Sequence, residues 1–126
     1  MVSKLIIIVD DDSSIRKAFS RLISLTKYTS MSFRDTKRCI YYLEQLNGTD
    51  LPFGYFVDMH IPEDQDGPEQ LHNFLNERGM LRNFYFMTGD LSSSNQQLRD
   101  RTGIDVLMKD NSYELFDVIN GMCSME

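Results

Sequence analysis

The sequence of 126 residues predicts one α/β domain, in which a parallel sheet of five strands is wound on both faces by five helices. Three observations support this prediction. Short unbroken apolar runs, as in residues 5–9, are typical of strands buried on both faces of a sheet. Segments with apolar residues at helical spacing alternate with these runs, which favours parallel strands joined by helices. No linker, repeat or low-complexity tract divides the chain, and its length suits a single domain.

The first two strands and their helices are expected in the first 46 residues. The apolar run 5–9 predicts the first strand, and a shorter segment at 31–33 predicts the second. The helices that follow are marked by apolar residues at helical spacing: Ile15, Ala18, Phe19, Leu22 and Ile23, then Cys39, Tyr42, Leu43 and Leu46. Ser13 or Ser14 is available to cap the first helix, and the Asn-Gly pair at 47–48 predicts the end of the second.

The second half of the chain repeats this alternation. Apolar runs at 54–60, 84–90 and 104–108 predict the third, fourth and fifth strands. The third and fifth helices are marked by Leu71, Phe74 and Leu75, and by Leu115, Val118, Ile119 and Met122. Gly79 is expected to end the third helix. The stretch 91–102 has only Leu91 and Leu98 as apolar anchors, so we expect its helix to be weakly held and mobile.

Composition and charge exclude several classes of function. The net charge of −6 argues against direct binding to nucleic acid or to an anionic membrane, because both need basic surface. No apolar run approaches the roughly 18 residues of a membrane span, and the first run is too short for a signal peptide. Cys39 and Cys123 lack motif spacing, which favours free thiols in a reducing cytoplasm. We therefore expect a cytoplasmic protein.

Polar residues follow four of the five apolar runs at the point where each run ends: Asp10, Asp11 and Asp12, then Asp58, Thr88 and Lys109. The carboxyl ends of parallel strands meet at one edge of a sheet, which is where ligands bind in such folds. Clustered carboxylates suit Mg²⁺, and a lysine ammonium with a threonine hydroxyl suits phosphate oxygens. A carboxylate beside them can act as a nucleophile and form an acyl phosphate. The pattern therefore predicts phosphoryl transfer at this edge.

This pattern resembles the receiver domains of bacterial two-component response regulators, of which the chemotaxis receivers are examples. The resemblance covers the whole chain, 1–126, as a single receiver domain, and allows for a longer regulator of which it is the N-terminal part. It is based on Asp10-Asp11, on "DMHIP" at 58–62, on "MTG" at 87–89 and on Lys109. It implies a flavodoxin-like fold and a role in phosphorelay signalling, with Mg²⁺ as the cofactor.

The resemblance also implies a role for each matched residue. Asp58 accepts a phosphoryl group from the phosphohistidine of a sensor histidine kinase or a histidine phosphotransfer protein. Asp11 binds Mg²⁺ directly and Asp10 mainly through water, while Asp58 and the backbone carbonyl of His60 complete the protein ligands. Thr88 and Lys109 contact the phosphoryl oxygens. The domain would catalyse its own aspartyl phosphorylation and dephosphorylation, and the fourth helix, fifth strand and fifth helix would present the switched surface to a downstream effector protein or domain.

Two other readings of the residues stay open. The stretch "IIIVDDDSSI" also resembles the first motif of haloacid-dehalogenase-type phosphatases, with Asp10 as nucleophile and Asp12 as general acid. That reading leaves Asp58 unexplained, and it lacks a further acidic pair outside the last helix. A receiver-like interaction module that is not phosphorylated is the third reading. For Asp12 the receiver resemblance implies no fixed role, and we expect it to cap the first helix.

Four features depart from the resemblance or need a prediction of their own. The interval from Asp58 to Gly67 is one residue longer than the resemblance implies, so we expect a bulged loop. Asp110 stands where proline usually follows the lysine, so we predict a trans peptide bond there. Val106 replaces an aromatic switch residue, and we expect it to act only in packing. His72 is expected on the exposed surface of the third helix.

Overall fold

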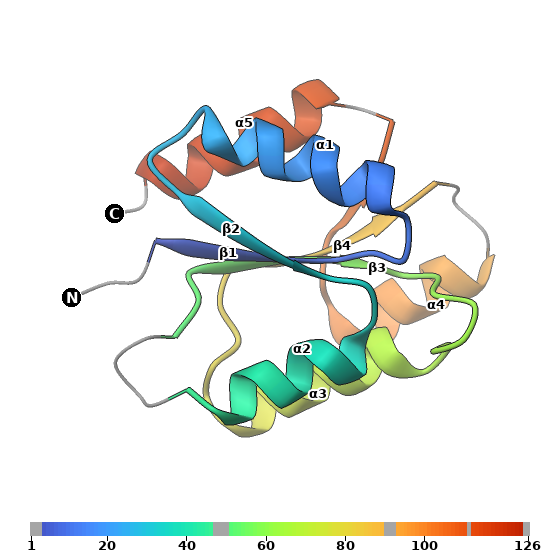
Figure 1. Cartoon of the computed structure of the whole chain (residues 1–126). Helices are drawn as coiled ribbons and strands as arrows, with labels where there is room; N and C mark the ends of the chain where they lie inside the picture. Colours follow the sequence, from blue (N-terminus) through green and yellow to red (C-terminus); the bar gives the residue numbers. More distant parts are fainter. Residues whose placement is uncertain (1–3, 47–50, 90–92, 111, 125–126) are drawn as a thin grey trace.

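A computed structural model describes residues 4–46, 51–89, 93–110 and 112–124 (Figure 1). In these residues strands and helices alternate strictly, as the sequence predicts. In chain order the elements are β1 (Leu5–Val9), α1 (Ser13–Ser24), β2 (Thr29–Phe33), α2 (Thr36–Glu44), β3 (Gly54–Asp58), α3 (Gly67–Glu77), β4 (Phe84–Thr88), α4 (Ser93–Thr102), β5 (Val106–Met108) and α5 (Ser112–Ser124).

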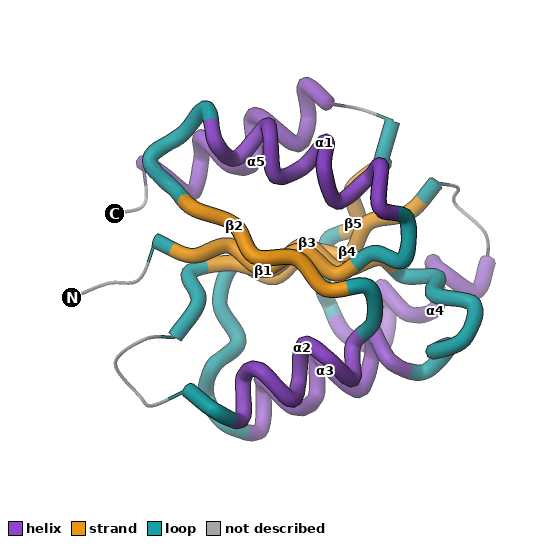
Figure 2. Tube along the Cα trace, viewed as in Figure 1, coloured by secondary structure: helices purple, strands orange, loops and turns teal. Residues whose placement is uncertain are grey.

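The strands form one sheet in the order β2-β1-β3-β4-β5, and every neighbouring pair is parallel. Figure 2 shows this sheet as a middle layer between two layers of helices, with α1 and α5 on one face and α2 and α3 on the other. Leu98 of α4 packs in the same core cluster as residues of α2 and α3, so α4 belongs to their layer. The predicted doubly wound α/β fold is confirmed.

Two hydrophobic cores fill the space between the layers because side chains alternate between the faces of each strand. Ile7, Tyr55 and Val57 point into the core beneath α2 and α3. Ile8 and Phe56 point into the core beneath α1 and α5. Both faces of β1 and β3 are therefore buried, which explains why their sequences are apolar runs without alternation.

Several predicted boundaries differ from the structure. β2 begins two residues earlier than predicted and lies at the edge of the sheet, where all five of its residues are half-buried or exposed. β3 ends at Asp58 and β4 at Thr88, because the chain turns away from the sheet there. β5 begins at Val106 rather than at 104, since its pairing with β4 starts at Phe86. The predicted stop at 47–48 and the predicted anchor Leu91 lie outside the described residues; Leu98 is buried, as expected.

The prediction for His72 is wrong, because its side chain is buried. The ring lies edge-on to Phe84 with 5.7 Å between ring centroids, and Nδ1 lies 3.1 Å from Oδ1 of Asn73. His72 shares the inward face of α3 with Pro68, Leu71 and Leu75, which recur every three or four residues. A histidine in that stripe could have been assigned to the core from its spacing alone.

Two further expectations from composition concern the cysteines and the membrane. Cys39 is a free thiol on the buried face of α2, while the side chain of Cys123 lies outside the described part of the chain. None of the helices in the described residues is long and apolar enough to cross a bilayer.

Candidate functional site

The strand register brings the predicted residues to one edge of the sheet. Val9 pairs with Val57, so Asp10 and Asp58 follow at the same level on neighbouring strands. On the other side of β3, Thr88 and Lys109 extend the ladder, because Lys109 N donates a hydrogen bond of 2.9 Å to the Thr88 carbonyl. These residues therefore leave the sheet side by side at its carboxyl edge.

Lys109 joins the two buried carboxylates. Its Nζ lies 2.7 Å from Oδ2 of Asp10 and 3.1 Å from Oδ2 of Asp58. The side chain of Asp10 is fully buried, that of Asp58 is 3% exposed, and that of Lys109 is 17% exposed. The second oxygens are held by the backbone: Oδ1 of Asp10 accepts from Asp12 N at 2.9 Å, and Oδ1 of Asp58 accepts from His60 N at 3.1 Å. Two carboxylates thus share one ammonium in a site that excludes most water.

Burial and the contacts among the charged groups shift the pKa values of Asp58 and Lys109. It raises the pKa of Asp58 to about 6; the Asp10 charge adds to this rise, while the His60 amide and the Lys109 ammonium oppose it. Burial by itself lowers the pKa of Lys109, but its contacts with Asp10 and Asp58 outweigh that effect and raise it. At pH above about 7 the site therefore holds a carboxylate at position 58 and an ammonium at position 109.

Asp10, Asp11 and Asp58 form a cluster that fits a hard divalent cation. Each offers one carboxylate oxygen, and these oxygens lie within 4.8 Å of one another. Oδ2 of Asp10 has no hydrogen-bond donor in good geometry among the described residues and faces only the Lys109 ammonium. Three carboxylates against one ammonium leave negative charge, and Mg²⁺ and Ca²⁺ prefer oxygen ligands. The donor set therefore suits the predicted metal, whereas the carbonyl of His60 as a ligand stays a prediction.

The turn between β1 and α1 is held by contacts within the acidic stretch. Asp12 is the N-cap of α1, as expected, and its Oδ1 accepts from Ser14 N at 2.9 Å and from Ser14 Oγ at 2.6 Å. These two bonds lower the pKa of Asp12. The alternative caps, Ser13 and Ser14, are wrong. Sequence reasoning missed Arg16, whose Nη1 donates a 2.7 Å bond to the Asp10 carbonyl and so fixes the backbone of a site residue.

The remaining predicted residues lie around this centre. Thr88 is buried at the end of β4, on the strand next to Asp58, while its contact with phosphoryl oxygens stays a prediction. Val106 is half-buried against the core beneath α3 and α4. The described residues contain no cis peptide bond, so the predicted trans bond between Lys109 and Asp110 is confirmed. The side chain of His60 is exposed, and only its backbone contacts Asp58.

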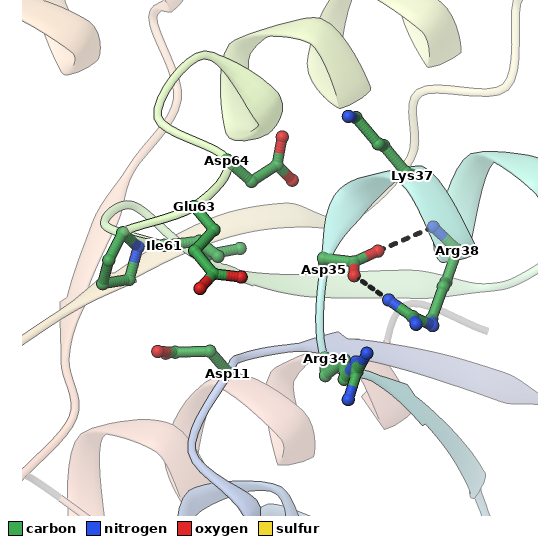
Figure 3. A pocket seen from close by; sticks show the side chains of 9 residues that line it. Asp11, Arg34, Asp35, Lys37, Arg38, Ile61, Glu63 and Asp64 are labelled. Carbon is green, nitrogen blue, oxygen red and sulfur yellow. Dashed lines mark hydrogen bonds and ion pairs between the residues drawn. The ribbon is translucent and has the colours of Figure 1, made fainter.

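A polar pocket of about 500 Å³ opens beside the acidic cluster on the Asp11 side (Figure 3). Its walls come from the turns that follow β1, β2 and β3 and from the first turn of α2. They are lined by Asp11, Arg34, Asp35, Lys37, Arg38, Ile61, Pro62, Glu63 and Asp64. The figure shows acidic side chains of the β1 and β3 turns opposite the basic side chains that follow β2. Sequence reasoning missed this pocket, because it is built from three separate turns.

The longer loop between β3 and α3 forms two consecutive turns. Asp64 N donates to the Ile61 carbonyl at 2.9 Å, and Gly67 N donates to the Asp64 carbonyl at 3.0 Å. Met59 and Ile61 point into the core while His60 lies outside, so alternate residues anchor the loop. The loop therefore lies against the domain beside Asp58 rather than extending into solvent.

Comparison with known proteins supports the fold assignment. No family model matches the chain, and no curated protein matches its sequence. Among solved structures, it is similar to a response regulator receiver protein from Pseudoalteromonas atlantica (20% identity, TM-score 0.77, 95% of this chain and 97% of that one). It is also similar to the signal receiver domain of an HD domain-containing protein from Pseudomonas fluorescens (20%, 0.79, 98% and 97%).

A third similar structure is a response regulator protein from Burkholderia pseudomallei, solved with a phosphorylated aspartic acid, a calcium ion and citrate. Its identity to this chain is 15% and the TM-score is 0.73, and the match covers 93% of this chain and 66% of that one. At such identities the similarity supports the fold assignment and not the role of individual residues. The chain has the fold of the response regulator receiver domains.

Proposed function

We propose that this domain is a phosphorelay receiver, in which Asp58 accepts a phosphoryl group from the phosphohistidine of a sensor histidine kinase or a histidine phosphotransfer protein. The observation that carries the proposal is the buried arrangement of Asp10, Lys109 and Asp58 at the carboxyl edge of a receiver-fold sheet. The calcium ion and phosphorylated aspartic acid in the Burkholderia structure support it by analogy. A cytoplasmic location is part of the proposal.

Asp58 is suited to act as the nucleophile. Its Oδ1 is held by the His60 amide, which fixes the orientation of the carboxylate, and its Oδ2 lies against the Lys109 ammonium. In the transfer an Asp58 oxygen forms a bond to phosphorus while the phosphorus–nitrogen bond to the donor histidine breaks, and the imidazole nitrogen keeps the electron pair. Later attack of water on phosphorus releases inorganic phosphate and restores the carboxylate.

The groups around Asp58 would stabilise the charge that the transfer brings into the site. Lys109 and the Thr88 hydroxyl would contact phosphoryl oxygens, and the lysine charge would compensate the added negative charge. Asp10, Asp11, Asp58 and the His60 carbonyl would hold Mg²⁺, which supplies further charge neutralisation when bound. The protein's own contribution is a dry, pre-arranged site.

Phosphorylation would act on partners by shifting the population between two surface conformations. We expect α4 to respond to phosphorylation, because Leu98 is the only buried side chain among the α4 residues whose burial the structure describes. We propose that α4, β5 and α5 form the face that a downstream effector protein or domain recognises. The similar receiver from an HD domain-containing protein shows that such a domain can occur beside another one.

The test is incubation with Mg²⁺ and acetyl phosphate, followed by mass mapping of the modified residue. We expect a phosphoryl adduct on Asp58 that is absent from Asp58→Asn and present in Asp66→Asn, an exposed acid of the neighbouring loop. Modification at Asp10 would support the phosphatase reading instead, although Asp12, its general acid, is engaged in capping α1. No adduct with or without a kinase would support the interaction module.

A further inference from the structure

The carboxylate of Asp64 ties the loop after β3 to the first turn of α2. Its Oδ2 accepts a 3.0 Å hydrogen bond from Thr36 N and a second one from Thr36 Oγ1. These residues are 28 positions apart in the sequence, and Thr36 is fully buried. A buried hydroxyl and an amide at a helix start both need an acceptor, and one carboxylate oxygen serves both.

Gly67 closes this contact from the third side. A methyl group at Gly67 would overlap Thr36 Oγ1 and the Asp64 carboxylate. The start of α2, the loop and the start of α3 therefore meet at a single point with no room for another atom. Sequence reasoning assigned no role to Thr36 or Asp64, because neither lies at the end of a strand.

The contact is connected to the candidate site through the loop itself. Asp64 N binds the Ile61 carbonyl, Ile61 is buried in the core, and His60 N binds the Asp58 carboxylate. The segment from Ile61 to Asp64 also forms a wall of the pocket that Asp11 lines (Figure 3). Asp64 itself is not part of the Asp10, Asp11 and Asp58 cluster.

We infer that Asp64 is a positioning residue for the cation site of the proposed receiver: by binding Thr36 it holds the loop that carries residues 59–61 in place beside Asp58 and Asp11. The inference rests on the proposed function. On this inference Asp64 acts through its hydrogen bonds to Thr36 rather than through its charge, because its Oδ2 accepts both bonds and its carboxylate is not part of the acidic cluster. Outer-shell groups of this kind commonly control metal affinity without touching the metal.

The test compares Mg²⁺ affinity by isothermal titration calorimetry in Asp64→Ala and Glu63→Ala. Glu63 is the matched control, because it lines the same pocket, carries the same charge and forms no hydrogen bond or ion pair with another described residue. We expect Asp64→Ala to bind Mg²⁺ about tenfold more weakly than Glu63→Ala. In the metal-free protein, the amide of Gly67 should exchange its hydrogen faster in Asp64→Ala than in the control.

Asp64→Asn separates the geometric role from an electrostatic one. Its amide oxygen can accept both bonds from Thr36, so positioning predicts that Mg²⁺ affinity stays close to that of Glu63→Ala. Thr36→Ser keeps the hydroxyl and should retain affinity, while Thr36→Val should lose part of it. Thermal melting of each variant verifies that it is folded. If Asp64→Ala does not fold, the Mg²⁺ affinities of Asp64→Asn and Thr36→Ser are compared with that of Thr36→Val instead.

Two results would overturn the inference, and they differ from each other. If Asp64→Ala and Glu63→Ala weaken Mg²⁺ binding equally, or if Asp64→Asn weakens it as much as Asp64→Ala does, Asp64 acts through charge alone. The proposed function survives either result. If the wild-type domain binds no Mg²⁺ and forms no adduct on Asp58, the proposed function fails and the positioning role fails with it.

Discussion

The middle of the sheet and its β5 edge differ in how firmly they are held. β3 lies in the middle, pairs with a strand on each side and buries all five of its residues. β5 lies at the edge, has three residues, and buries only Leu107 completely. Next to it, α4 contributes Leu98 to the core and a surface ion pair between Arg101 and Glu69 of α3.

This difference teaches where chemistry and movement can be placed in one small domain. Asp58 ends the most buried strand, so the proposed nucleophile is positioned by both cores. Segments with few buried contacts open at low free-energy cost, and α4 with β5 fits that description. A firmly held Asp58 beside a loosely held helix suits the proposed switch, because charge added at Asp58 could then shift α4 without disturbing the core.

The largest expected effect comes from truncating the centre of the sheet. Phe56→Ala removes a fully buried ring from β3 and should lower the free energy of unfolding by about 3–5 kcal/mol. Leu98→Ala should lower it by about 2 kcal/mol, because α4 can detach without unfolding the sheet. Urea titration monitored by circular dichroism measures both. Equal losses of unfolding free energy in Phe56→Ala and Leu98→Ala would contradict the difference between the middle of the sheet and its β5 edge.

Removing Lys109 tests whether the site charges are balanced. Lys109→Met leaves two buried carboxylates without their cation and should destabilise the domain by about 3 kcal/mol at pH 7. Lys17→Met, on the exposed face of α1, is the control and should change little. Adding Mg²⁺ should restore part of the loss in urea titrations, since the acidic cluster then gains another positive charge. A neutral effect of Lys109→Met without Mg²⁺ would contradict the ion pairs.

The raised pKa of Asp58 predicts how stability depends on pH. The folded state binds this proton more tightly than the unfolded chain, so Asp58 lowers stability as pH rises from about 4 to about 6, by about 3 kcal/mol in total. Asp58→Asn should therefore be more stable than wild type at pH 7, with little difference near pH 4. Asp12→Asn is a control of opposite sign, because its pKa is lowered. Urea titrations at both pH values measure the free energies of unfolding that test this prediction.

A smaller effect on stability is expected at Val106 in the edge strand β5, and its substitution also tests whether this residue takes part in the proposed switch. Val106→Ala should cost about 1 kcal/mol, as removal of half-buried methyl groups does. Passive packing predicts that beryllofluoride shifts the amide resonances of α4 in Val106→Ala as it does in wild type. Loss of these shifts, with Asp58 still phosphorylated, would show that Val106 takes part in the response.

The smallest effect is expected from the ion pair between α4 and α3. Arg101 Nε lies 3.1 Å from Glu69 Oε2, and Nη2 lies 3.2 Å from Oε1, but the side chains are 54% and 35% exposed, so water and salt reach the pair. A double-mutant cycle with Arg101→Ala and Glu69→Ala should show a weak coupling that salt removes. Hydrogen exchange in α4 should rise in either variant. A coupling that resists salt would mean that α4 is held more firmly than its burial suggests.

Local patterns predicted most of the fold and the centre of the site. An apolar run followed by a polar residue marks the end of a buried strand, which is how Asp10, Asp58, Thr88 and Lys109 could be found. The cap formed by Asp12 is equally local, since its partner is two residues away. The burial of His72 could also have been found in this way, from its spacing on α3. The contacts of Arg16 and of Asp64 could not, because they depend on which segments pack together.

The sequence by itself determined the order of strands and helices and the set of groups at the carboxyl edge, since backbone geometry and side-chain alternation act over a few residues. Only the tertiary structure decided that one lysine would lie between two carboxylates and that Asp64 would bind Thr36. Such contacts join segments far apart in the chain, and their distances are set by the packing of both cores. The groups that meet at the site are therefore predictable from the sequence, whereas the contacts that balance their charges are not.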